Sequence, residues 1–61
     1  MNENQYLCLS HAKSLTTLSR TLMRIAAEFA VIREADKAQE ALKMAREYAR
    51  RATDYIDQAF K

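Results

Sequence analysis

The chain has 61 residues, so it forms one small domain at most, and such a domain buries too little surface for high stability on its own. It contains no glycine, no proline and one cysteine, which favours helix throughout and excludes an intramolecular disulfide. Ten Lys and Arg residues against eight Asp and Glu residues give a net charge of +2, a mixed surface rather than a polyanion-binding composition. Because chains this short usually need disulfides, metals or self-association, we expect self-association.

The first helix is expected over about residues 3–33. Asn2 with Gln5 three positions later has the form of a capping box, and Glu3 stands in the first turn, where the helix dipole favours an anion. Five Ser and Thr residues between 14 and 21 leave a later start at Ser10 as an alternative. A stripe of eight residues then repeats at alternating spacings of three and four: Cys8, His11, Leu15, Leu18, Leu22, Ile25, Phe29 and Ile32. This heptad spacing predicts that the helix packs on another helix.

The stripe loses its register between Arg33 and Lys37. Asp36 with Gln39 has the form of a second capping box, which predicts a turn over about 33–36 and a second helix over about 37–60. The alternative is one bent helix of about 57 residues, because no Gly or Pro interrupts the chain. We prefer an all-α, two-helix antiparallel hairpin forming a single domain, since two separate apolar stripes then bury each other.

A bulky stripe on the first helix is expected to pack against an alanine-rich stripe on the second. Alanine at every seventh position lets two helix axes approach closely, and the large residues opposite fill the remaining space. The residues predicted to pack in this way are Leu15, Leu18, Leu22, Ile25, Phe29 and Ile32 from the first helix, with Leu42, Ala45, Ala49, Ala52, Ile56 and Ala59 from the second.

Further apolar residues lie outside these two stripes, and a lone hairpin cannot cover all of them. They are Leu9, Met23, Ala41, Tyr48, Tyr55 and Phe60. We predict that they form the interface of a homodimer, in which two hairpins make a four-helix bundle. The alternative is a monomeric hairpin that carries these residues on its surface.

Chemistry-bearing residues are few. Cys8 and His11 lie three apart on one helical face, and two such pairs in a dimer would have the composition of a zinc site, but one such pair is a weak signal. We therefore predict no metal, no cofactor and no catalytic residues, and a protein that is not an enzyme. A basic stripe of Lys13, Thr17, Arg20 and Arg24 gives nucleic-acid binding as the second hypothesis.

The apolar stretches are interrupted by charges, and residues 1–6 are polar, so we expect no membrane segment, no secretory signal and a cytoplasmic location. In length, lack of Gly and Pro, and heptad pattern, the chain resembles the small helical-hairpin accessory proteins of bacteriophages and plasmids, including short early-region products of lambdoid phages. This resemblance is one of overall form. It implies a small regulatory or adaptor protein that acts by binding an unidentified protein partner in a bacterial or phage-infected cell.

Overall fold

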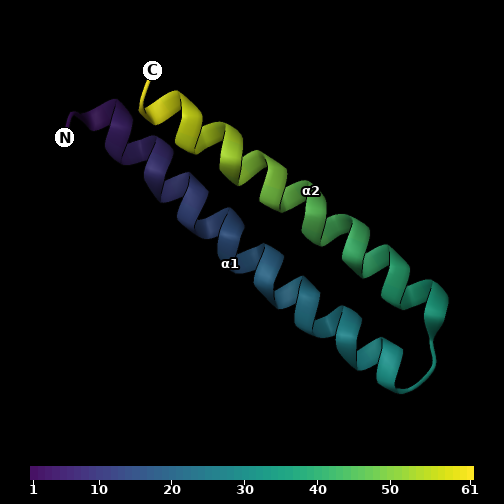
Figure 1. Cartoon of the computed structure of the whole chain (residues 1–61). Helices are drawn as coiled ribbons and strands as arrows, with labels where there is room; N and C mark the ends of the chain where they lie inside the picture. The colour runs from purple at the N-terminus through teal and green to yellow at the C-terminus, as the bar shows by residue number, and fades with distance from the viewer.

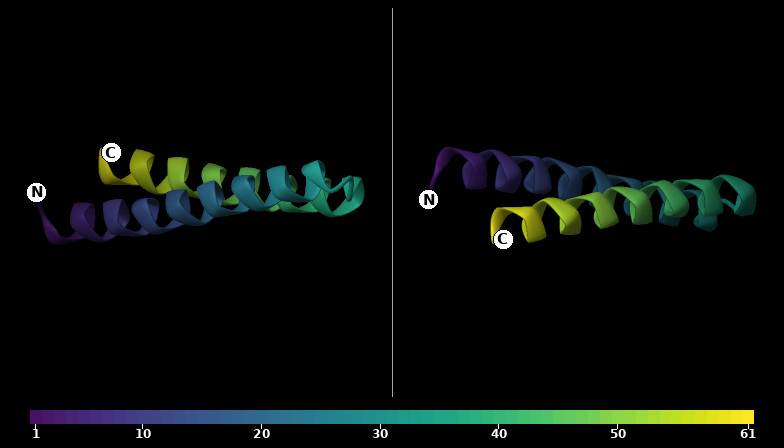
Figure 2. Two further views of the ribbon diagram at one scale, coloured as in Figure 1. Left: turned by 90° about the horizontal axis from the view of Figure 1, so that it is seen from below. Right: turned by 90° about the horizontal axis from the view of Figure 1, so that it is seen from above.

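The computed structural model describes all 61 residues as a two-helix antiparallel hairpin, which confirms the predicted all-α class and excludes the single bent helix. Helix α1 spans Glu3–Val31 and helix α2 spans Ala35–Ala59. The two helices lie side by side along their whole length, with both termini at one end and the connection at the other (Figure 1). Figure 2 shows that they cross at a shallow angle, and the Cα trace measures 46 × 13 × 9 Å.

Helix α1 begins at the predicted capping box. The Asn2 side chain accepts a hydrogen bond from the Gln5 amide at 2.8 Å, and the Gln5 side chain accepts one from the Asn2 amide at 3.1 Å. These two bonds satisfy amide groups that the first helical turn leaves without partners. The capping-box prediction is confirmed, and the alternative start at Ser10 is wrong.

The turn is shorter than predicted because α1 ends in a Schellman motif. The amide of Arg33 donates to the Ala30 carbonyl at 3.0 Å, and the amide of Glu34 donates to the Phe29 carbonyl at 2.8 Å. Arg33 adopts a positive φ of 64°, the left-handed conformation that glycine usually supplies. In a non-glycine residue this conformation costs about 1 to 3 kcal/mol, which the surrounding hairpin offsets.

Helix α2 therefore begins at Ala35, two residues before the predicted start. Its N-cap is Glu34, whose side chain makes no capping hydrogen bond. The predicted capping box of Asp36 and Gln39 is wrong, because the Schellman motif reverses the chain within Ile32 to Glu34 and Asp36 already lies in the first helical turn. There its carboxylate is still favourable to the helix dipole.

Small side chains fill the contact between the helices. The buried residues are Cys8, Ala12, Ser19 and Ala26 on α1, with Ala41, Ala45, Ala52 and Ala59 on α2. Both sets follow the same spacing of four, seven and seven residues. No large side chain is fully buried. The closest approach of the helices is thus alanine against alanine, and the bulky residues lie to either side of it.

One hydrogen bond crosses the centre of this contact. The Ser19 hydroxyl, which is 4% exposed, donates to the Ala45 carbonyl at 2.8 Å. A serine side chain reaches a backbone carbonyl of a neighbouring helix only when the two backbones lie close together. Ser19 therefore contributes to the fold in two ways, as a small residue that permits close approach and as a donor that joins α1 to α2.

The residues that face the other helix differ from the predicted packing stripes by one residue at every second position. Ala12, Ser19 and Ala26 face α2 where His11, Leu18 and Ile25 were expected, and Leu18 is 46% exposed. On α2 the inward positions are Ala41, Tyr48 and Tyr55, whereas Leu42, Ala49 and Ile56 lie to one side. The shared positions Leu15, Leu22, Phe29, Ala45, Ala52 and Ala59 do lie along the contact. Ile32 lies in the turn and is 64% exposed, so it packs on neither helix.

Candidate interaction faces

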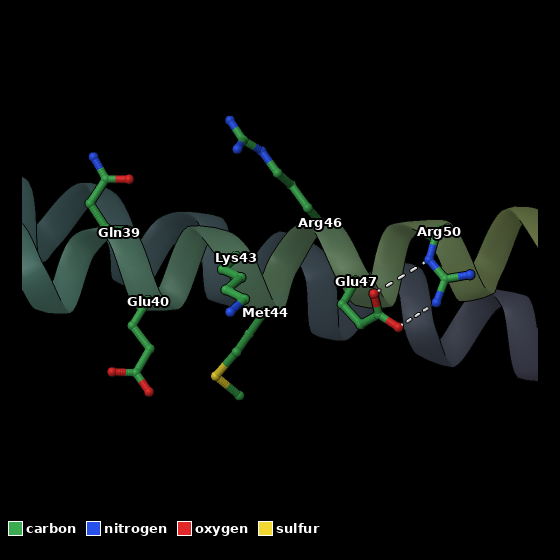
Figure 3. A pocket seen from close by; sticks show the side chains of 7 residues that line it. All are labelled: Gln39, Glu40, Lys43, Met44, Arg46, Glu47 and Arg50. Atoms are coloured by element: carbon green, nitrogen blue, oxygen red, sulfur yellow. Dashed lines mark hydrogen bonds and ion pairs between the residues drawn. The ribbon is translucent and has the colours of Figure 1, made fainter.

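The hairpin has two long sides, and each carries a row of incompletely covered apolar side chains. Figure 3, which views α2 from outside, shows Gln39 and Arg46 pointing to one side, with Glu40 and Met44 pointing to the opposite side. The side that includes Met44 is called face A below. The side that includes Gln39 and Arg46 is called face B.

Face A contains a groove between large apolar side chains of both helices. Its groove is lined by Leu22, Ile25 and Phe29 from α1, and by Lys37, Glu40, Ala41 and Met44 from α2. Leu18 precedes Ile25 by seven residues, so the row continues along α1, and Ile32 lies just beyond the end of that helix. Leu18, Ile32 and Met44 are 46%, 64% and 44% exposed. Face A is therefore a row of large apolar side chains that the chain itself covers only in part.

Aromatic residues connect α1 to α2 along face A. The rings of His11 and Tyr55 stack with centroids 5.1 Å apart and an interplanar angle of 24°. The Lys37 ammonium lies 5.8 Å from the centroid of the Phe29 ring. The Arg51 guanidinium lies at the same distance from the Tyr48 ring on its own helix. Such cation–π contacts are worth about 0.5 to 1 kcal/mol when exposed.

The residues predicted to form the dimer interface do not share one surface. Ala41 is 7% exposed and, with the half-buried Tyr48 and Tyr55, lies against α1. Leu9 and Met23 line grooves of face B on the other side of the hairpin. Phe60, which follows the end of α2, is 71% exposed. The hairpin therefore does not gather these six residues on one surface, because the inward stripe of α2 is the one that carries the tyrosines, and the homodimer interface stays a prediction.

Face B has a narrower row of apolar side chains than face A, and basic side chains lie along its edges. One groove is lined by Met23, Ala26, Ala27, Ala30, Ala38, Gln39 and Leu42, and a second is lined by Leu9, Ala12, Lys13, Thr16, Thr17, Arg20 and Ile56. Neither groove is lined by a carboxylate. The alanines make the middle of this face shallow, so its larger side chains stand along both edges.

The cations of face B have no acidic partners. Lys13 and Arg20 line its second groove, and Arg46 points to the same side as Gln39 (Figure 3). All the ion pairs in the structure involve Arg50 or Arg51, which contact Glu47 at 2.6 and 3.4 Å, while Arg50 also reaches Asp54 at 3.5 Å. Lys13, Arg20 and Arg46 consequently present unneutralised positive charge.

Two acidic residues of α2, Glu47 and Asp54, form ion pairs with arginines of the same helix. The hydrogen bond from Arg50 holds the pKa of the Glu47 carboxyl below its usual value, and the charges of Arg50 and Arg51 act in the same direction. Glu47 raises the pKa of Arg50 in turn, chiefly through the same hydrogen bond. These groups are exposed, and exposed ion pairs contribute little to stability.

The predicted basic stripe is present and exposed. Thr17, Arg20, Thr21 and Arg24 line one shallow depression on α1, and Lys13 lies near it in the groove with Thr17 and Arg20. The Thr17 hydroxyl donates to the Lys13 carbonyl of its own helix at 3.1 Å, so its hydrogen is already used within α1. Arg20 and Arg24 make no ion pair.

Cys8 and His11 are placed in different environments. Cys8 is 8% exposed and packs among the small residues between the helices, whereas His11 is exposed and stacks on Tyr55. No group of three or more His, Cys, Asp or Glu side chains lies close enough to hold a metal ion. A zinc site formed from this pair would therefore require ligands from a second chain.

The hairpin exposes more surface than a compact protein of its size. Its accessible surface is 4923 Å². A monomeric globular protein of 7.1 kDa is expected to expose about 4,100 Å². The excess of about 800 Å² equals the area that one partner buries in a protein–protein interface of ordinary size.

Comparisons with protein-family models, with curated proteins and with solved structures found no match to this chain. Neither helix has an apolar stretch long enough to cross a membrane.

Proposed function

We propose that this protein is a small, non-enzymatic regulatory or adaptor protein that acts by binding other protein chains, beginning with a second copy of itself. The observation that carries the proposal is an accessible surface some 800 Å² larger than that of a compact monomer, on which large apolar side chains such as Leu18, Met23 and Met44 are exposed. Contiguous apolar surface of several hundred Å² on a small protein marks an interaction site. The shallow, open grooves of the hairpin support a role in binding rather than in catalysis.

Face A is the surface we assign to the second copy. Its groove is lined by both a cation, Lys37, and an anion, Glu40. In a dimer with two-fold symmetry the same surface occurs on both copies, so a face that carries both signs can place its cations opposite its anions. The product is a four-helix bundle with Leu18 and Ile25 at its centre.

The cellular setting follows from the same features. An all-helical chain of 61 residues with heptad spacing and no Gly or Pro resembles accessory proteins of phages and plasmids. On this resemblance we propose that the protein acts in the cytoplasm of a bacterial or phage-infected cell, where it modulates host or replicon processes through its partner.

Leu18→Asp is expected to weaken self-association by about tenfold or more, because it places a carboxylate in the apolar centre of the dimer. Thr17→Asp is the matched control, since Thr17 is the neighbouring residue and lies outside face A. Sedimentation velocity at several concentrations measures both variants. A dimer that persists equally in Leu18→Asp and Thr17→Asp would show that face A does not bind a second copy.

Nucleic-acid binding is the second candidate function, and the unpaired Arg20 and Arg24 favour it. If it holds, Arg20→Glu with Arg24→Glu should reduce binding to a 20-base-pair DNA duplex at least tenfold and leave helicity unchanged. The wild-type affinity should also fall steeply with salt, because phosphate contacts release counterions. Electrophoretic mobility shift at two salt concentrations measures this. Equal affinity in the wild type and the double variant would exclude the basic stripe.

A further inference from the structure

Face B has a different character from face A, and a second copy of the chain does not suit it. Lys13, Arg20 and Arg46 stand along its edges, and no carboxylate lines its grooves. Two copies related by two-fold symmetry would bring these same cations into one interface. Like charges placed together across an interface cost several kcal/mol, which disfavours self-packing here.

The apolar part of face B has the dimensions of a helix-binding groove. Its two grooves follow one another along α1 between Leu9 and Ala30, which is about 32 Å at 1.5 Å per residue, and the groove around Met23 is the more apolar of the two. Alanines line the groove between Met23 of α1 and Leu42 of α2, while Ala12 lies in the other groove, between Leu9 of α1 and Ile56 of α2. A third helix can approach an alanine-lined groove closely, and the flexible Met23 side chain can adapt to its surface.

We propose that face B binds an acidic amphipathic helix of a partner protein, which deepens the proposed adaptor function and rests on it. The apolar side of that helix contacts the alanine-lined groove, and its flanking glutamates or aspartates reach Lys13, Arg20 and Arg46. Amphipathic helices are commonly recognised in this way, by apolar anchors spaced three and four residues apart. The charges select an acidic partner over a basic one and increase the rate of association.

The probe for this proposal is a fluorescent synthetic helix of 21 residues with Leu at its heptad core positions and Glu at the flanking positions. The repelling glutamates also keep the peptide itself from pairing. A second peptide carries Lys in place of every Glu, and a 20-base-pair DNA duplex is the third ligand. Fluorescence anisotropy measures binding of each ligand to the full chain, and light scattering measures the mass of every variant.

The acidic peptide should bind at least tenfold more tightly than the lysine peptide. Met23→Gln with Leu42→Gln should weaken its binding about tenfold without changing the mass of the protein. Met44→Gln is the control, because it makes the same substitution on face A. The variant Arg46→Glu should reduce the preference for the acidic peptide.

Four results would overturn the proposal: no binding of the acidic peptide, equal binding of both peptides, tighter binding of the DNA duplex, or a fall to the single-chain mass in Met23→Gln with Leu42→Gln. The last would place the second copy on face B instead. A wild-type chain that does not dimerise is a separate result. It would be seen in the mass of the wild type, and binding of the acidic peptide could still be measured.

Discussion

Ala45→Leu is expected to separate the two helices and to lower the stability of the hairpin substantially. Ala45 has an exposed fraction of 0%, and its carbonyl accepts the hydrogen bond from Ser19. Added methylene groups in a packed contact cost about 1 to 3 kcal/mol and sometimes more. A chain of 61 residues has only about 3 to 9 kcal/mol of stability to lose. Thermal unfolding followed by far-ultraviolet circular dichroism measures the effect.

Ala27→Leu is the matched control for this substitution. Ala27 is exposed, so the same added volume meets solvent, and both substitutions exchange one good helix former for another. We expect Ala27→Leu to unfold close to the wild-type temperature. If Ala45→Leu is as stable as Ala27→Leu, the helices do not approach each other through their alanines.

Leu22→Asp is expected to abolish helicity and dimerisation together. Leu22 is half-buried where the contact between the helices meets face A, and it lines a groove with Phe29, Ala41 and Met44. Burying a leucine stabilises a protein by about 1.5 to 3 kcal/mol, and a carboxylate there adds a desolvation cost. Thr17→Asp serves again as the control. If the Leu22→Asp variant keeps the helical signal and the mass of the wild type, Leu22 contributes neither to the contact between the helices nor to the dimer.

The ends of the elements were predictable only where the chain signals them locally. The capping box of Asn2 and Gln5 is such a signal, and α1 begins where it indicates. The end of α1 is not signalled, because Arg33 rather than glycine adopts the left-handed conformation of the Schellman motif. The pattern of Asp36 and Gln39 then suggested a cap in what is already the interior of α2.

The one-residue displacement of both packing stripes has a physical cause. The heptad spacing of apolar residues predicts which side of a helix packs on its neighbour. Helix α1 has two adjacent stripes with this spacing, and hydrophobicity alone favours the stripe of bulkier residues as the packing side. In a pair of helices the closest approach is set instead by the smallest side chains. The signal was present as Ala12, Ser19 and Ala26, seven residues apart, which match the alanine repeat of α2.

The interaction faces depended on that register. Because the small residues face inward, Leu18 and Ile25 lie on face A, while Met23 and Leu42 lie on face B. The exposure of the basic stripe was predictable, because Lys13, Arg20 and Arg24 recur at helical spacing among polar residues. The overlap of this basic stripe with the apolar groove of face B was not predictable, because that groove exists only once the position of α2 is known.

The mass of the wild-type chain in solution tests the central claim, that a second copy covers an apolar face of this hairpin. Light scattering coupled to gel filtration measures it directly over a range of protein concentrations. We predict twice the single-chain mass of 7.1 kDa at micromolar concentration, with dissociation only on strong dilution. A mass of 7.1 kDa with full helicity at every concentration would contradict the claim.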